Sequence, residues 1–173
     1  MRIVAGRWRG RIIEAPAGAA VRPTLDRVRE AWMSILQKDI PGATVLDLFA
    51  GSGALGLEAL SRGAASADFV ERSAPSIRSL RANIEKLDAG ELSRVHRADA
   101  LKFIDGLRSD AFGIAFADPP YSEGAAARIA AHWLQLPFAS ILSVEHAAGE
   151  PMPAGGDTRR YGTSAITIYR SEE

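Results

Sequence analysis

The stretch Val45-Leu46-Asp47-Leu48-Phe49-Ala50-Gly51-Ser52-Gly53-Ala54-Leu55-Gly56 decides the fold. Its apolar first part predicts a buried strand over residues 44–49, and its G-x-G-x-x-G part opens a helix over 54–62 that Gly63 ends. In this strand–turn–helix context the glycines let backbone N–H groups and a helix amino terminus approach an anionic group closely. No lysine follows the loop, so it is not a phosphate-gripping P-loop. The stretch therefore predicts a nucleotide-type cofactor site.

Strand and helix patterns alternate along the rest of the chain. We expect helices over residues 75–87, 101–107 and 125–134, and strands over residues 67–70, 94–97, 112–117, 140–145 and 161–169. Repeated strand–helix units predict an α/β fold with a mostly parallel sheet that is covered on both faces. The last strand follows a Pro/Gly-rich loop and alternates apolar with polar residues, which predicts an antiparallel strand at the end of the chain.

An extension over residues 1–41 precedes the unit that spans residues 42–173. Within the extension, residues 2–4 and 10–14 predict two short strands of a hairpin. A helix then opens at Pro23, with apolar residues at the spacing of a buried stripe. The 173 residues are enough for one domain with its own core. We therefore expect one compact domain that carries a small N-terminal extension.

The composition excludes several classes of site. The chain has no cysteine, which excludes disulfides, thiolate-bound zinc and a cysteine nucleophile. Its three histidines lack the spacing of metal ligands, so we expect no metal. No apolar stretch approaches the roughly 20 residues of a membrane span. The first residues also lack the apolar region of a secretory signal, and we expect a cytoplasmic protein.

The formal net charge of zero hides an uneven distribution. Residues 1–30 hold seven arginines against three acidic residues, a local charge of +4 that the rest of the chain balances. A basic segment predicts an anionic partner, most commonly nucleic acid. Arginines outnumber lysines 18 to 3, so a bias in genomic base composition also explains the choice of arginine, although not the asymmetry of charge. Trp8 among these arginines either stacks on bases or packs the hairpin onto the body.

Acidic residues stand at the carboxyl ends of the predicted strands. Glu71 follows Gly51 by 20 residues, which is the place from which an acid binds ribose hydroxyls. Asp99 and Asp118 follow the next two strands, and Asp47 lies near the end of the first. The glycine loop and Glu71 alone fit either NAD or S-adenosylmethionine. The set of four carboxylates favours S-adenosylmethionine, because its sulfonium and ammonium groups are cationic whereas a dinucleotide is anionic.

Asp118-Pro119-Pro120-Tyr121 follows the apolar run over residues 112–117. Taken alone the tetrapeptide predicts a turn, since aspartate and proline are ordinary turn residues. It also closes the fourth predicted strand, at the edge where open α/β sheets bind ligands. There it would present a carboxylate, an aromatic ring and a backbone carbonyl beside the cofactor loop.

Together these motifs resemble a known family. Residues 45–56, the acidic set and the Asp-Pro-Pro-Tyr motif are similar to Rossmann-like class I methyltransferases that modify exocyclic amines. Residues 2–11, residues 22–30 and Tyr161-Gly162-Thr163 resemble more narrowly the bacterial 16S rRNA guanine-N2 methyltransferases (RsmD-like). The resemblance covers nearly the whole chain. It implies a mostly parallel seven-stranded sheet with an antiparallel C-terminal strand, S-adenosylmethionine as cofactor, and a guanine of small-subunit rRNA as substrate, within an assembling particle. We expect a monomer.

The resemblance also implies a role for individual residues. Asp118 and the Pro119 carbonyl would accept the two hydrogens of the guanine N2 amine, and Tyr121 would stack on the base once it has left its helix. Asp47 and the glycines would hold the methionine end of the cofactor. Glu71 would hold the ribose, and Asp99 with Ala100 the adenine. The cofactor-binding set is Asp47, Phe49, Ala50, Gly51, Ser52, Gly53, Glu71, Arg72, Asp99, Ala100 and Asp118. The RNA-binding set is Arg7, Trp8, Arg9, Arg11, Arg22, Arg27 and Arg29.

Other functions share parts of this pattern. A DNA amino-methyltransferase acting on adenine or cytosine can carry the same tetrapeptide, but this chain leaves no room for a sizeable target-recognition region. A methyltransferase of protein glutamine would favour asparagine at the position of Asp118. A catalytically silent RNA-binding protein would not require the acidic set. A nicotinamide oxidoreductase would give the Asp118 loop no role.

Overall fold

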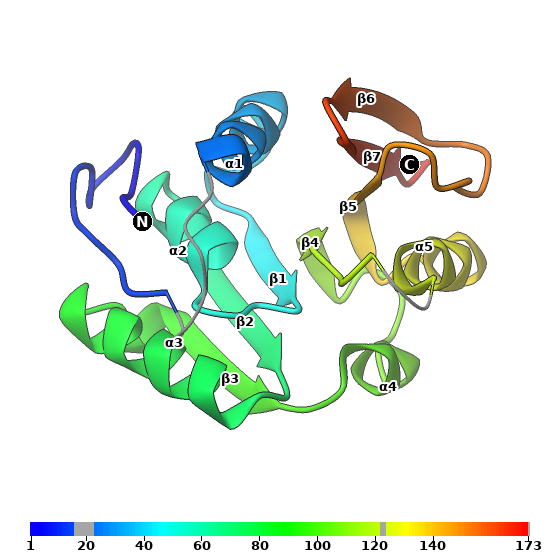
Figure 1. Cartoon of the computed structure of the whole chain (residues 1–173). Coiled ribbons are helices and arrows are strands. Elements are labelled where there is room, and N and C mark those ends of the chain that lie inside the picture. The colour runs from blue at the N-terminus through cyan, green and yellow to red at the C-terminus, as the bar shows by residue number, and fades with distance from the viewer. Residues whose placement is uncertain (16–22, 122–123, 173) are drawn as a thin grey trace.

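Seven strands form a sheet, and helices cover both of its faces (Figure 1). The computed structural model describes residues 1–15, 23–121 and 124–172, the side chains of residues 23–25 excepted. The strands are β1 (Thr44–Leu48), β2 (Ser66–Glu71), β3 (Ser93–Arg97), β4 (Phe112–Ala117), β5 (Ala139–Ala147), β6 (Asp157–Tyr161) and β7 (Ser164–Arg170). The helices are α1 (Pro23–Ile35), α2 (Ala54–Ser61), α3 (Ala74–Lys86), α4 (Ala100–Asp105) and α5 (Ala125–Gln135), with a 3₁₀ turn at Gly90–Leu92. No helix within the described ranges is long and apolar enough to cross a membrane.

The strand order is β3-β2-β1-β4-β5-β7-β6, which confirms the predicted α/β class. The first five strands of this order are parallel, and β7 and β6 add antiparallel pairs. On β1, Val45 pairs with Ala67 of β2 on one side and with Ile114 of β4 on the other. The direction of winding therefore reverses between β1 and β4. In open α/β sheets, ligands bind in the crevice at the carboxyl ends of the strands beside this point.

The end of the chain is a hairpin, where the sequence analysis predicted one strand over residues 161–169. The prediction of a single strand is wrong, because Gly162 adopts φ 64° and the chain turns there, so that Tyr161 of β6 pairs with Ser164 of β7. β7 has the apolar residues that suggested a strand, whereas β6 reads Asp-Thr-Arg-Arg-Tyr and is largely exposed. An edge strand of this composition has no apolar periodicity by which to recognise it.

Each face of the sheet has its own core. On one face, α1, α2 and α3 pack with the N-terminal segment, and on the other, α4 and α5. Trp32 of α1 lies edge-on against Phe116 of β4, with ring centroids 5.7 Å apart, and its indole N–H donates to Ser143 Oγ of β5 at 2.8 Å. This contact fixes α1 over the middle of the sheet. On the opposite face Trp133 of α5 packs on Tyr169 of β7.

The N-terminal segment forms a hairpin that is docked on α2. Arg2 and Ile12 pair antiparallel over one bridge, which is less than the two strands expected over residues 2–4 and 10–14. The docking instead uses the buried carboxylate of Glu58 on α2, which accepts hydrogen bonds from the N–H groups of Val4 (2.9 Å) and Ala5 (3.2 Å). The hairpin is therefore part of the folded body rather than a free arm.

Candidate active site at the carboxyl ends of β1 and β4

Positive φ angles shape the loop after β1. Phe49 adopts φ 59°, Gly51 57° and Gly53 88°. For Phe49, which has a Cβ, this left-handed conformation costs about 1–2 kcal/mol. A Cβ added at Gly51 would meet no atom within 4 Å, whereas one at Gly56 would lie 2.4 Å from Phe69 Cε1. The first glycine therefore leaves its backbone open to close approach, and the last lets α2 pack tightly against β2.

Asp47 is buried beside this loop with one oxygen unpaired. The residue is 1% exposed, and its Oδ2 accepts a hydrogen bond from the Gly56 N–H at 3.0 Å. Its Oδ1 has no hydrogen-bond partner among the described residues. The pKa of Asp47 is raised to about 8, mainly because the carboxyl is buried. The hydrogen bond from Gly56 lowers this pKa, and the charge of Glu71 raises it. A ligand that brings a cationic donor to Oδ1 would satisfy this atom and favour its ionised form.

Glu71 and Asp99 are fixed at the ends of β2 and β3 by hydrogen bonds from the backbone. Glu71 Oε1 accepts from the N–H of Gly51 at 2.9 Å, and Oε2 accepts from the two N–H groups that follow Glu71. Asp99 is the N-cap of α4, where its Oδ1 accepts from the N–H of Leu101 at 3.1 Å. A carboxylate has about four lone-pair sites, so both side chains are positioned and still have acceptor capacity for a ligand.

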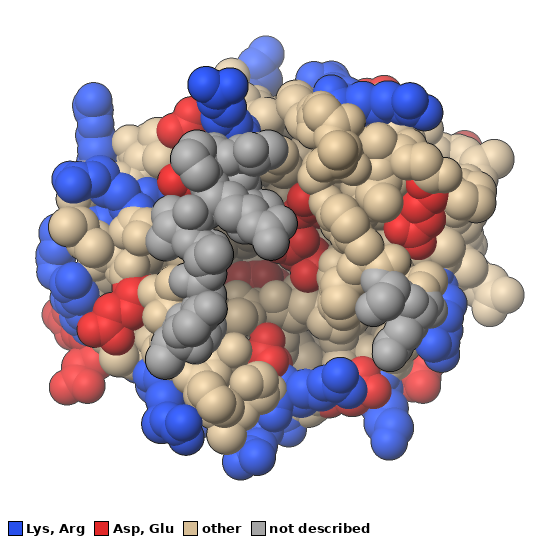
Figure 2. Space-filling view, viewed as in Figure 1, with Lys and Arg blue, Asp and Glu red and all other residues tan. Residues whose placement is uncertain are grey.

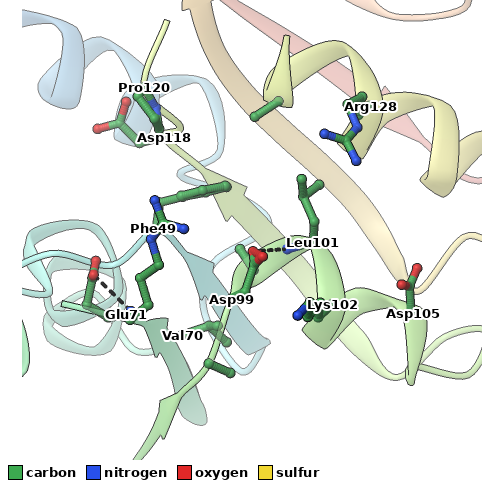
Figure 3. A pocket seen from close by; sticks show the side chains of 14 residues that line it. Phe49, Val70, Glu71, Asp99, Leu101, Lys102, Asp105, Asp118, Pro120 and Arg128 are labelled. Carbon is green, nitrogen blue, oxygen red and sulfur yellow. Dashed lines mark hydrogen bonds between the residues drawn. The ribbon is translucent and has the colours of Figure 1, made fainter. Parts of the chain in front are cut away.

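A cavity of ≈ 560 Å³ opens at this edge of the sheet (Figure 3). Its volume lies within the range of about 300–1,000 Å³ that is common for small-molecule sites. Its lining is Phe49, Val70, Glu71, Arg72, Ala98, Asp99, Ala100, Leu101, Lys102, Asp105, Asp118, Pro120, Ala125 and Arg128.

The cavity gathers part of the predicted cofactor set. The predicted residues that line it are Phe49, Glu71, Arg72, Asp99, Ala100 and Asp118, and those outside its lining are Asp47, Ala50, Gly51, Ser52 and Gly53. The second group still belongs to the same place, because Gly51 is hydrogen-bonded to Glu71 and the charge of Asp47 acts on Asp118. Sequence reasoning missed Lys102, Asp105 and Arg128, which come from α4 and α5. Figure 3 shows Arg128 across the cavity from Glu71.

Tyr121 is held at its hydroxyl end by β5 and β7. The hydroxyl donates to Glu145 Oε1 at 3.0 Å and lies 2.6 Å from Ser164 Oγ, from which it can accept a hydrogen bond. Glu145 and Ser164 are 3% and 5% exposed, whereas Tyr121 is 47% exposed. Burial of the hydroxyl raises the pKa of Tyr121, which the Ser164 hydrogen bond lowers and the charge of Glu145 raises. The ring is thus fixed at one end and accessible along its face.

Asp118 has a perturbed carboxyl group. The residue is exposed, and the carboxyls of Glu145 and Asp47 lie near enough for their charges to act on its own. Desolvation of the carboxyl raises the pKa of Asp118 above its usual range, and so do its interaction with Glu145 and the charges of Glu145 and Asp47. Carboxyl groups perturbed in this way concentrate at functional sites.

Glu145 is a further residue of this site that the sequence analysis did not identify. It was predicted only as the last residue of a strand, and the structure places it on β5, hydrogen-bonded to the Tyr121 hydroxyl and near enough for its charge to act on Asp118. The signal was present, because an acid that ends an apolar strand had already been used to select Glu71, Asp99 and Asp118. Pro119 is buried next to Asp118.

The residues predicted to bind RNA are divided by their exposure. Arg7, Arg9, Arg11 and Arg27 are exposed, so they are available to an anionic partner. Trp8 is 9% exposed and packs in the core, which favours the packing interpretation over base stacking. The remaining two residues are Arg29 and Arg22. Arg29 is 7% exposed and donates to the Arg2 carbonyl at 2.8 Å, and Arg22 lies outside the described residues.

The central hollow and the outline of the molecule differ in the charged side chains that they show. Figure 2 shows acidic side chains in the hollow near the centre of the view, and Lys and Arg side chains around its outline. The hairpin contributes to this basic rim and is joined to α3 by a hydrogen bond from Arg11 Nη2 to the Lys86 carbonyl at 2.9 Å. The acidic side chains in the hollow suit a small cationic ligand, and the basic side chains of the rim suit a polyanion.

Comparison with known proteins gives consistent matches over most of the chain. The family model described as Conserved hypothetical protein 95 matches residues 1–170. Two curated relatives are each named Ribosomal RNA small subunit methyltransferase D. The Haemophilus influenzae protein is 33% identical over 98% of this chain and 92% of its own length. The Escherichia coli protein is 44% identical over 72% of this chain and 62% of its own length. The solved structure of yhhF from Escherichia coli superposes with a TM-score of 0.85 at 35% identity, covering 99% of this chain and 98% of that one.

Proposed function

The chain belongs to the Conserved hypothetical protein 95 family, and we propose that its site transfers a methyl group from S-adenosylmethionine to the exocyclic N2 amine of a guanine in small-subunit rRNA. The protein is an S-adenosylmethionine-dependent methyltransferase with a Rossmann-like fold. The observation that carries the proposal is the meeting of two sets of residues at one edge of the sheet. Asp47, Glu71 and Asp99 stand on the cofactor side, and Asp118 with Tyr121 on the acceptor side.

The residues of the cofactor side fit S-adenosylmethionine. The unpaired, buried Oδ1 of Asp47 fits the ammonium group of the methionine end, because the cation would compensate the desolvation of the carboxylate. Glu71 fits the ribose hydroxyls, and Asp99 with Ala100 fits the adenine. When bound, S-adenosylmethionine supplies a methyl group that its sulfonium has already activated.

The acceptor side has to localise a weak nucleophile, because the lone pair of a guanine N2 amine is delocalised into the ring. Asp118 and the Pro119 carbonyl accept the two N–H hydrogens and so orient the nitrogen. The exposed face of Tyr121 offers a surface on which the base stacks. The base must leave its helix to reach this place, as in other enzymes that modify bases. Positioning and charge therefore supply most of the acceleration.

The basic rim docks the rRNA around the site. The exposed arginines Arg7, Arg9, Arg11 and Arg27 contact phosphates, and the docked hairpin holds three of them in a fixed relation to the cavity. A partly assembled small subunit presents a folded target of this kind. The protein acts on it as a monomer in the cytoplasm, where ribosomal subunits are assembled.

Transfer of label from S-adenosylmethionine to defined substrates tests this function. Unmodified small-subunit rRNA, assembled small subunits, duplex DNA and bulk protein are offered in parallel, and nucleoside analysis identifies the product. We expect N2-methylguanosine in rRNA or subunits. Asp118→Ala should slow single-turnover transfer about 100-fold or more, whereas Asp157→Ala on the exposed strand β6 should not. Methyladenine or methylcytosine in DNA, or near-normal transfer by Asp118→Ala, would overturn the proposal.

A further inference from the structure

Glu145 stands beside Asp118 at the carboxyl ends of two neighbouring parallel strands. Ala117 of β4 pairs with Val144 of β5, so the residues that follow them, Asp118 and Glu145, come next on adjacent strands. Neighbouring strands of a sheet lie about 4.8 Å apart. The register therefore brings the backbone of a second acidic residue next to the residue that meets the amine in the proposed function.

The Glu145 carboxyl reaches the acceptor loop itself. Its Oε1 accepts a hydrogen bond from the Tyr121 hydroxyl at 3.0 Å, and Ser164 Oγ lies 2.6 Å from the same hydroxyl. These contacts place the carboxyl at the hydroxyl end of the Tyr121 ring, whose exposed face stacks on the base in the proposed function. A carboxylate has about four lone-pair sites, so the Tyr121 bond leaves Glu145 with acceptor capacity for a further donor.

Within the described part of the chain, Glu145 is buried and takes part in no ion pair. The residue is 3% exposed. The basic side chains that line the cavity with Asp118 are Arg72, Lys102 and Arg128; all three residues are exposed, and Glu145 is not part of that lining. A buried acceptor is costly unless donors meet it. Glu145 therefore suits a ligand edge that is rich in neutral N–H donors.

The Watson–Crick edge of guanine is such an edge, because N1–H and the two N2 hydrogens stand side by side on it. Adenine and cytosine present a lone pair at the ring nitrogen beside their amine. An ionised carboxylate is an acceptor only, so it attracts the N1–H of guanine and repels that lone pair. Proteins read the splayed-out bases of RNA through this edge. A second acidic residue next to Asp118 thus has a chemical reason in a site for guanine.

We infer that Glu145 selects guanine by accepting a hydrogen bond from its N1–H, while Asp118 and the Pro119 carbonyl accept those of the N2 amine. The inference rests on the proposed function, because it takes Asp118 and Tyr121 as the residues that meet the base. It adds a residue of β5, outside the Asp-Pro-Pro-Tyr motif, that decides which base is accepted. A site built to hydrogen-bond one group rejects an analogue that lacks it, since the polar groups of the protein are then left unpaired.

A base analogue isolates the contact at N1. 2,6-Diaminopurine carries the same 2-amine as guanine but has a lone pair at N1. Small-subunit rRNA is prepared with this base in place of the guanine that the wild type methylates, which mapping of the product locates. We expect the wild type to prefer guanine about 100-fold or more in kcat/KM. We expect Glu145→Gln to reduce this preference about 10-fold or more, because a side-chain amide can donate to the N1 lone pair.

Two further variants separate selection of the base from positioning of the ring. Tyr121→Phe removes the hydroxyl bonded to Glu145 and keeps the ring. If Glu145 acted only by positioning Tyr121, this variant would narrow the preference for guanine as Glu145→Gln does. We expect it instead to change kcat/KM for the two bases by the same factor. Glu85→Gln, on the exposed side of α3, serves as the control, and calorimetric binding of S-adenosylmethionine verifies that each variant is folded.

A measurement without methyl transfer distinguishes failure of this inference from failure of the proposed function. Saturation-transfer NMR compares the binding of guanosine and of 2,6-diaminopurine riboside to protein loaded with S-adenosylhomocysteine. We expect the wild type to prefer guanosine and Glu145→Gln to lose the preference. A wild type that treats the two bases alike in either measurement, or a preference that Glu145→Gln leaves unchanged, would overturn the inference. A wild type that methylates no RNA but binds the nucleosides with the expected preference would remove the proposed function alone.

Discussion

At the scale of one residue, the buried Asp47 carboxyl of the site lowers the stability of the folded protein. A buried carboxyl whose pKa is raised from 3.8 to about 8 binds its proton more tightly in the folded than in the unfolded chain. As pH rises from about 4 to 8, the unfolded chain releases this proton first, and the free energy of unfolding falls. Oδ1 has no partner in the described structure to offset that loss. A residue retained at such a cost is expected to have a function.

Asp47→Asn should therefore stabilise the protein and impair it. We expect the free energy of unfolding at pH 8 to rise by about 1–2 kcal/mol, since a neutral amide can still accept from the Gly56 N–H, and the gain to vanish near pH 4. Urea unfolding of both proteins at pH 4, 6 and 8 measures this difference in the free energy of unfolding. A variant that is less stable than the wild type at pH 8 would contradict this account of Asp47.

Cofactor binding should release a proton from the same residue. In the proposed function the ammonium of S-adenosylmethionine lies against Asp47 and would favour its ionised form. Binding below pH 8 should then displace the proton, and affinity should rise with pH up to about 8. Calorimetry at pH 7 in buffers of different ionisation enthalpy measures the proton released. We expect release in the wild type and its loss in Asp47→Asn. Equal release by both proteins would assign it to another group.

At the scale of the element, polar contacts hold the N-terminal hairpin close against α2. Besides the Glu58 bonds, the Arg7 N–H donates to the Ser61 carbonyl at 2.9 Å and the Ser61 hydroxyl donates to the Ala5 carbonyl at 2.6 Å. Gly6 lies at this contact, and a Cβ there would stand 1.8 Å from the Ser61 carbonyl oxygen. The hairpin can dock only because that position has no side chain.

Gly6→Ala and Gly10→Ala form a matched pair that isolates this contact. Both glycines have positive φ, 89° and 84°, but a Cβ at Gly10 would meet no atom within 4 Å. Gly10→Ala should cost about 1 kcal/mol from backbone strain alone. Gly6→Ala should cost more and release the hairpin, which increased amide exchange over residues 3–8 would report. Equal effects of the two substitutions would show that the close approach is unimportant.

At the scale of the whole molecule, acidic side chains gather in the central hollow, and most basic side chains lie around the rim (Figure 2). The acidic groups gather where the strands end, and the exposed arginines of the hairpin stand outside them (Figure 2). The formal net charge of zero therefore does not describe what a ligand meets. A small cation and a polyanion are each attracted to a different part of one surface.

Replacing the hairpin arginines should weaken RNA binding and leave cofactor binding unchanged. Arg7, Arg9 and Arg11 changed together to Gln should reduce the slope of log K against log salt by about 2–3, because each phosphate contact contributes about 0.7–0.9. Filter binding of small-subunit rRNA at several salt concentrations measures the slope. The control variant changes the exposed Arg94, Arg97 and Arg108 to Gln. An equal reduction in the control would mean that the hairpin is not a specific docking surface.

The elements of the fold were predictable where local signals are strong. The strand–glycine–helix unit at residues 44–62, the alternation that follows it and the acids at strand ends all depend on short-range pattern, and the structure places them as expected. The second C-terminal strand was not predicted, because β6 is polar and only its pairing with β7 defines it. The sequence left two interpretations of Trp8, base stacking or packing of the hairpin onto the body. Its burial in the core favours packing.

The sequence by itself determined the α/β fold, the cofactor loop and the family, because these depend on residue types at fixed spacing along the chain. The tertiary structure decided which carboxyl groups share a site and which arginines remain exposed. Glu145 lies 24 residues beyond Tyr121 in the chain and within hydrogen-bonding distance of it in space, since β5 pairs in parallel beside β4. Proximity of that kind is set by strand pairing across the sheet, and the desolvation and coupling of charges that give the site its chemistry exist only once the sheet has formed.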